Sequence, residues 1–322
     1  GFVANTQQDV DELCALAGQT DFRPSDGIVA TNVLINGIRI PYVQPRLEDI
    51  EDVDDTQDFD HLEGRFVDGF PAQASPAPYP FPIARLGGVE GELRFPIISD
   101  PLLANPQRAM IGKARRLNAA EVKDVISEAA RRCRITRAGI RLPLGTSAKT
   151  WIVVVSNPQR NGEPATILGT FRVGEATMFS WDVAAQKART AVFFSNRQLA
   201  MSTRSIGFLS QRFFPPGIDG RAHGPFFGFQ EAVSLRQHPR GGFPGNPNLP
   251  NGITIFPGGF PLYKDGYLVG AIGVSGDGVD QDDIVSASGC KDFLPKHSIR
   301  ADSYTYRGAR LPYAKFPRDP VR

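Results

Sequence analysis

The stretch FPGGFPLYKDGYLVGAIGVSGDGVDQDD, residues 256–283, carries the densest pattern in this chain of 322 residues. Two apolar runs flank the turn Lys264-Asp265-Gly266, and the second run leads into glycines and then a cluster of acids. Such runs joined by a short turn predict two antiparallel strands, and carboxylates favour the start of a helix. A phosphate loop is a poorer interpretation, because GVSGDG has neither dinucleotide nor P-loop spacing and its aspartates would repel phosphate.

The residues upstream predict a second hairpin between two helices. NAAEVKDVISEAARRC, residues 118–133, pairs Asn118 with Glu121 as a capping box and repeats apolar residues at helical spacing. TWIVVVSN and ATILGTFRV predict two strands, and SWDVAAQKARTAVFFS predicts an alanine-rich helix that starts at a Ser180 N-cap and lies close to the sheet. Two hairpins with interspersed helices indicate an α+β fold with a mostly antiparallel sheet.

The rest of the chain divides into segments with weaker signals. We expect residues 1–110 to form an irregular N-terminal extension, with a small hairpin at Asn36-Gly37 and an acidic loop at 48–60. The main domain then covers 111–296, with an aromatic, glycine- and proline-rich insertion at 215–252. Residues 297–322 form an extended tail that we expect to wrap the surface or reach a neighbouring subunit.

Bulk properties exclude several classes of protein. The net charge of +2 leaves no electrostatic footprint for nucleic acid, and no apolar run approaches the length of a membrane span. Cys14, Cys133 and Cys290 lack the spacing of c-type haem attachment or a zinc knuckle. No signal peptide is visible in GFVANTQQDV, although a removed leader stays an alternative. The sequence leaves the cellular compartment open, with a periplasmic or extracellular location favoured over the cytoplasm.

Several side chains are candidates for binding. His223 and His238 fall in the aromatic insertion, where they are either solvated or axial ligands of a haem, which needs a nitrogen ligand in an apolar slot. Lys187 or Arg189 either reaches solvent or pairs with an anionic group such as a propionate. Acids at the helix start form a weak candidate site for iron or magnesium, namely Asp280, Asp282 and Asp283, and the acidic loop at 48–60 is a weak calcium option that lacks EF-hand spacing.

Three segments together resemble the GlcG/HbpS-type haem-binding family, which includes the PduO C-terminal-type domain. They are WIVVVSNPQRNGEPATILGTFRV, SWDVAAQKARTAVFFSNRQLA and ITIFPGGFPLYKDGYLVGAIGVSGDGVDQDD, with the core motifs at Lys187–Ala191 and Pro257–Gly276. The resemblance covers about residues 117–294, without the insertion at 215–252. It implies a profilin-like, five-stranded antiparallel sheet flanked by helices, and assembly into an oligomer.

The resemblance also implies a function, a haem- or tetrapyrrole-binding module with a sensing, storage or accessory role. Its expected pocket is lined by Lys187, Thr190, Phe194, Gly258, Gly259 and Phe260, with His223 or His238 as axial ligand. A structural or assembly subunit without a cofactor is the alternative, and a small-molecule enzyme using Lys187 or an acid pair is a second one, although we lean toward a protein that is not an enzyme. We expect a homo-oligomer or a subunit of a larger assembly, without nucleic acid or a membrane span.

Overall fold

The structure is a computed structural model that describes residues 34–35, 38–39, 81–140, 142–143, 145–160, 162–229, 249 and 252–315. The chain divides into two units, Gly1–Asp68 and Gly69–Arg322. In the first unit, β1 (Leu34–Ile35) pairs antiparallel with β2 (Ile38–Arg39), on either side of Asn36-Gly37. The predicted acidic loop at 48–60 lies outside the described residues.

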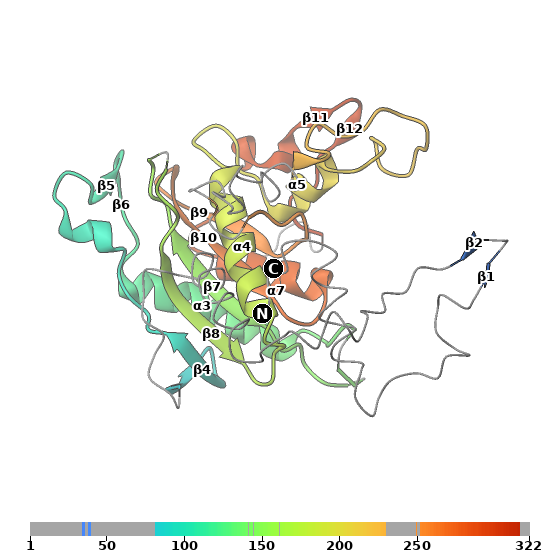
Figure 1. The fold of residues 1–322 in the computed structure, drawn as a ribbon. Coiled ribbons are helices and arrows are strands. Elements are labelled where there is room, and N and C mark those ends of the chain that lie inside the picture. The colour runs from blue at the N-terminus through green and yellow to red at the C-terminus, as the bar shows by residue number, and fades with distance from the viewer. Residues whose placement is uncertain are drawn as a thin grey trace, which may run out of the picture. The chain divides into compact units, whose positions relative to one another are not determined.

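The second unit is built on one antiparallel sheet of six strands (Figure 1). Its order is β3-β4-β8-β7-β10-β9, and each neighbouring pair runs antiparallel. The strands are β3 (Ile83–Leu86), β4 (Val89–Phe95), β7 (Trp151–Ser156), β8 (Ile167–Val173), β9 (Gly259–Lys264) and β10 (Tyr267–Ser275). The predicted α+β class with an antiparallel sheet is therefore confirmed.

The expectation of five strands was wrong, because the sheet also includes the hairpin β3–β4. This hairpin lies in the range 1–110 that the sequence assigned to the extension, yet β4 pairs with β8 through Leu93 and Phe171. The β4 sequence VEGELRF alternates apolar or small residues with charged ones, the period of a strand with one buried face. This alternation was the signal in the sequence for β4, which the sequence analysis missed. The sheet begins with β3 at Ile83.

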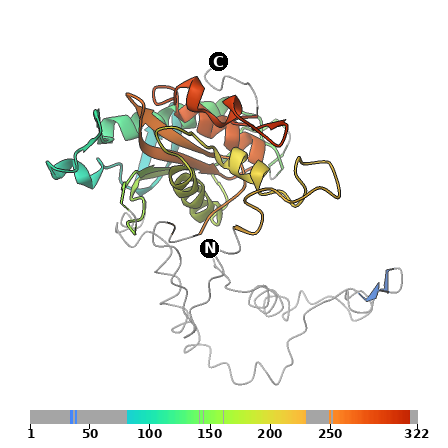
Figure 2. The same ribbon diagram turned by 90° about the horizontal axis from the view of Figure 1, so that it is seen from above.

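Helices cover both faces of this sheet (Figures 1 and 2). A Cβ added to Gly273 of β10 would meet Ala184 of α4 (Ser180–Phe193). The adjacent residue Ile272 instead contacts Gly289 of α7 (Val279–Gly289), which packs beside α3 (Ala119–Ile135). Since successive side chains of a strand point to opposite faces, α4 lies on one face and α3 with α7 on the other.

Local sequence signals explain where these elements begin and turn. Asn118 and Glu121 form the predicted capping box of α3. The two-residue turn between β9 and β10 places Asp265 at φ 50° and Gly266 at φ 80°, the left-handed conformation that favours glycine in a tight hairpin. Helix α4 differs slightly from prediction, because its N-cap is Phe179 and Ser180 is already helical.

The segments that follow α4 pack onto the same unit. They comprise α5 (Thr203–Leu209), which the sequence analysis did not predict, and the short hairpin of β11 (Thr305–Tyr306) with β12 (Ala309–Arg310). A further small hairpin joins β5 (Met110–Ile111) to β6 (Ala114–Arg115). Tyr313 of the tail is buried, and its carbonyl accepts a hydrogen bond from Ser202, so the described part of the tail wraps its own domain. Among the helices described, none has the length and apolar character to cross a bilayer.

Candidate functional site

Lys187, the first residue of the predicted pocket, is buried, and its charge is balanced by an ion pair with Asp282. Its Nζ is 2.8 Å from Asp282 Oδ2 and 2.8 Å from the Val274 carbonyl, and the two charged side chains are only 1% and 5% exposed. A buried charge is tolerated when an opposite charge and hydrogen bonds accompany it. In this arrangement the Lys187 ammonium is paired with the protein's own carboxylate.

Gly258 and Gly259 serve the same interior packing. A Cβ at Gly258, where φ is 119°, would lie 2.5 Å from the Val274 carbonyl and 3.0 Å from Lys187 Nζ. A Cβ at Gly259 would lie 2.5 Å from the Lys187 carbonyl, and the Gly259 N–H donates to Thr203 Oγ1 at 2.9 Å. Glycine therefore allows the backbone to approach helix α4 closely, so that the space beside it is filled by protein.

Thr190 and Phe260 complete this packed region. The Thr190 hydroxyl donates to the Gln186 carbonyl at 2.7 Å and accepts from the Thr254 N–H at 3.1 Å. Phe260 is buried against the edge of Tyr313, with ring centroids 5.2 Å apart. Five of the predicted pocket residues therefore lie near one another, namely Lys187, Thr190, Gly258, Gly259 and Phe260. They lie beneath Tyr313 of the tail, and each contacts other residues of the protein.

The three acids at the start of α7 face cations from other elements. Asp282 pairs with Lys187, whereas Arg204 of α5 donates to Asp280 at 2.9 Å and to Asp283 at 3.0 Å. No group of three or more potential metal ligands occurs in the part of the chain that is described. These acids therefore join α4, α5 and the tail to α7 rather than gathering around a common point.

Burial changes the protonation of Asp283. Burial raises the pKa of this carboxyl from its ordinary 3.8 to about 6, against the opposing effect of Arg204. Burial also acts to raise the pKa of Asp280, but hydrogen bonds from Lys315 and Arg204 lower it overall. The pKa of Asp283 therefore lies above the ordinary value of an aspartate, and the pKa of Asp280 lies below it.

Two of the remaining predicted residues, Phe194 and His223, lie in an aromatic region at the end of α4 and the start of the insertion. Phe194 contacts three other rings, with centroid distances of 5.3, 5.2 and 5.6 Å to Phe193, Phe226 and Phe229. His223 stacks on Phe227 at 5.2 Å, and its Nδ1 is 3.0 Å from the Gly224 carbonyl. His238 lies outside the described residues.

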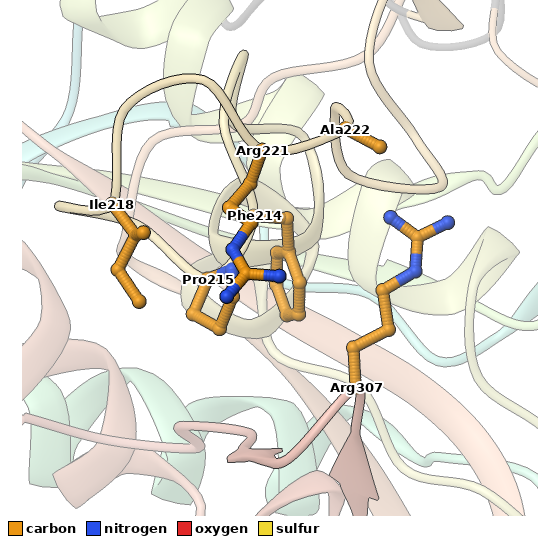
Figure 3. Close-up of a pocket in the computed structure, with 6 residues that line it drawn as sticks. All are labelled: Phe214, Pro215, Ile218, Arg221, Ala222 and Arg307. Atoms are coloured by element: carbon orange, nitrogen blue, oxygen red, sulfur yellow. The ribbon is translucent and has the colours of Figure 1, made fainter.

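A cavity of about 440 Å³ opens beside His223, between the insertion and the C-terminal hairpin. Its lining residues are Phe214, Pro215, Ile218, Arg221, Ala222 and Arg307 (Figure 3). In the view of Figure 3 the Arg221 side chain lies in front of Phe214 and Pro215, whereas Arg307 comes from the turn between β11 and β12. Arg307 Nη1 also donates to the His223 carbonyl at 2.9 Å, which links the cavity to the histidine.

The sequence analysis missed every residue of this lining. The insertion was recognised by its composition, and the run Arg221-Ala222-His223 placed a cation beside a histidine that was already a candidate. Arg307 carried no local signal for binding, because its partner segment is distant along the chain.

A second, smaller cavity of about 110 Å³ lies near the turn between β7 and β8. Its lining includes Arg189, the other predicted anion partner, together with Arg160 and Glu163. Burial lowers the pKa of Arg189 to about 10, and its Nε donates to the Ala165 carbonyl at 3.1 Å. Glu163 lies in this lining and pairs with Arg160 as well as with Arg108. The cavity therefore already contains a carboxylate among its cations.

Comparison with protein families matches residues 151–291 to the family described as "Haem degrading protein HbpS-like". This segment is similar to the HbpS-like family. The family resemblance of the sequence is therefore confirmed, while no curated protein matches the chain. The HbpS-like segment contains Lys187, Gly258 and His223, whereas Arg307 lies beyond its end.

Six chains of solved structures are similar to this chain, and they include the following three. The PduOC:Heme complex is 21% identical with a TM-score of 0.37 and covers 54% of this chain and 93% of its own. The ORFY protein of Klebsiella pneumoniae is 19% identical with a TM-score of 0.37 and covers 56% and 94%. A double mutant of HbpS from Streptomyces reticuli is 18% identical with a TM-score of 0.34 and covers 56% and 88%.

Proposed function

We propose that this chain is a haem-binding module in which His223 supplies the axial ligand to the iron, in a sensing, storage or accessory role. The observation that carries the proposal is the setting of the His223 ring, which stacks on Phe227 with Nδ1 beside the Gly224 carbonyl. Since a carbonyl oxygen only accepts hydrogen bonds, Nδ1 is the donor in this contact, and in the neutral imidazole Nε2 then holds the lone pair. An imidazole oriented in this way by a backbone carbonyl is a common metal ligand.

The surroundings of His223 also suit a haem. The family description of residues 151–291 names haem, and the insertion supplies several exposed or half-buried aromatic rings near the histidine. Haem, when bound, would supply an iron centre, and the protein would supply the axial nitrogen, the apolar contacts and the limits on solvent access. Lys187, by contrast, is assigned a structural role, because its charge is paired with Asp282.

Titration of hemin into the full chain tests the proposal. We expect one haem per chain and a shifted Soret band that is lost in His223→Ala and retained in His297→Ala, a control at a histidine bonded to Ser303. A parallel His238→Ala variant tests the other histidine of the insertion. Absence of the band, or its loss in His238→Ala alone, would overturn the assignment of His223.

Two further measurements define the role. Native mass spectrometry of the loaded protein reports the number of copies and the retained haem together, and we expect a homo-oligomer. Exposure of the loaded protein to ascorbate and oxygen separates storage from turnover. A stable Soret band supports a binding role, whereas bleaching with release of iron would indicate the degradation that the family description names.

A further inference from the structure

The cavity beside His223 combines apolar walls with two guanidinium groups from separate segments. Phe214, Pro215 and Ile218 give it an apolar side, and Arg221 and Arg307 give it cations. Its volume of about 440 Å³ falls in the range of small-molecule sites, roughly 300–1,000 Å³. A site of this kind suits a ligand that is apolar over most of its surface and anionic at one edge.

These two arginines differ from three buried or half-buried cations of the domain. Arg116, Lys187 and Arg204 each pair with an aspartate. Among the described residues, neither Arg221 nor Arg307 forms an ion pair with a carboxylate.

The charge around the cavity is therefore positive. Between residues 211 and 229 the sequence holds two arginines and a histidine against the single acid Asp219, and Asp219 does not line the cavity. Guanidinium groups recognise carboxylates through paired, charge-assisted hydrogen bonds. The site thus favours an anion on electrostatic grounds.

We propose that this cavity binds the ring edge and the carboxylates of a porphyrin, so that recognition does not require the iron. This inference rests on the proposed haem-binding function and specifies its ligand class as planar, apolar dicarboxylates with or without a metal. Arg307 links the two parts of the site, because it lines the cavity and donates to the His223 carbonyl. The arginines hold the carboxylates, and His223 adds selectivity for the iron-loaded form.

Metal-free protoporphyrin IX is the probe that separates the two parts. It has the ring and both carboxylates but no iron, so its binding depends on the cavity and not on an axial ligand. We expect Arg221→Gln combined with Arg307→Gln to weaken its binding about tenfold, since each partly exposed charge-assisted pair contributes modestly.

The matched control is Arg212→Gln, which removes a cation just before the insertion. Arg212 stacks over Phe213 at 5.5 Å and does not line the cavity, so its loss should leave protoporphyrin affinity unchanged. The dimethyl ester of protoporphyrin IX provides a control in the ligand, because it keeps the ring and lacks the negative charges. We expect it to bind about tenfold more weakly than the free acid to the unmodified chain. Far-UV circular dichroism and thermal melting confirm that each variant is folded.

The outcomes distinguish the two proposals. Arginine-dependent binding of the free acid, with weak binding of the ester, supports the cavity even where hemin gives no His223-dependent Soret band. Equal affinity of the unmodified chain and the double arginine variant for protoporphyrin IX overturns the cavity, even where hemin coordinates His223. Equal binding of acid and ester overturns the role of the carboxylates, and no binding of the free acid overturns the inference as a whole.

Discussion

Asp283 offers a quantitative test because burial and ion pairing act on it in opposite directions. Its Oδ2 accepts from Arg204 Nε at 3.0 Å and from the Lys315 N–H at 2.8 Å, while Oδ1 is buried with no hydrogen-bond partner among the described residues. Burial prevails and raises the pKa of Asp283 from 3.8 to about 6. The folded protein therefore holds this proton more tightly than the unfolded chain does.

The sign of the pH dependence follows from this difference. Below about pH 4 the carboxyl is protonated in both states and has no effect on stability. As the pH rises from about 4 to about 6, the unfolded chain loses the proton first, so the free energy of unfolding falls. A pKa difference of about two units corresponds to roughly 3 kcal/mol, which the folded state loses by neutral pH.

Asp283→Asn is neutral at every pH and should remove this cost. We expect the free energy of unfolding to rise by about 1–3 kcal/mol near pH 7.5, with the gain shrinking towards zero near pH 4. The lower bound allows for an amide that fits the Arg204 guanidinium less well. Arg204 does not become an unpaired buried charge, because it is 18% exposed and retains Asp280.

Urea denaturation followed by tryptophan fluorescence at both pH values measures this change. Asp280→Asn is the matched control of opposite sign. Hydrogen bonds from Lys315 and Arg204 outweigh burial at this residue and lower its pKa, so its charged form stabilises the fold above the acid range. Its removal should reduce stability near neutral pH and matter less in acid. If Asp283→Asn also lost stability at neutral pH, the ion pair would outweigh burial and the reasoning would be refuted.

Three further predictions concern the interior. Lys187→Met removes the cation that pairs with the buried Asp282 carboxylate, so we expect the free energy of unfolding measured in urea to fall by about 3–5 kcal/mol. Combining Lys187→Met with Asp282→Leu should restore stability, and an unchanged urea midpoint in the single variant would contradict the buried pair. Gly259→Ala places a Cβ 2.5 Å from a backbone carbonyl and should lower the free energy of unfolding by about 1–3 kcal/mol. In Gly278→Ala the Cβ meets only the end of a flexible side chain, so the loss should stay under about 1 kcal/mol. Equal melting temperatures of the two variants would argue against the close approach at Gly259. Burial raises the pKa of Cys133 to about 11, so iodoacetamide near pH 8 should label it in urea and not in the native protein, and rapid native labelling by mass spectrometry would place the thiol at the surface.

Elements with strong local signals could be predicted from the sequence. The capping box at Asn118 specifies the start of α3, and the turn at Asp265-Gly266 specifies the β9–β10 hairpin, because both depend on residues a few positions apart. The alternation in VEGELRF was an equally local signal for β4, and the proline-rich residues before it obscured the continuity of the domain. Helix α5 has only seven residues and includes Gly207, so propensity alone did not identify it.

The candidate site was harder to predict because its interactions join distant segments. Lys187 was a candidate binding residue on α4, but its partner Asp282 is contributed by α7, and the sequence did not indicate this pairing. Arg221 and Arg307 meet at one cavity for the same reason, through a hairpin of the tail. Residue type and local pattern identify groups that carry charge, whereas the fold decides which of them remain available to a ligand.

The packing at the glycine motif bears on where the proposed ligand would bind. At Gly258 and Gly259 the backbone passes so close to α4 that a Cβ would meet Lys187, and the lysine is already paired with Asp282. A ligand bound there would have to break a buried ion pair, whereas one bound beside Arg221 and Arg307 would gain ion pairs at partly exposed cations. The energetic comparison thus favours the insertion and tail over the motif as the place of recognition. The family-like core then acts as the scaffold that positions these two segments.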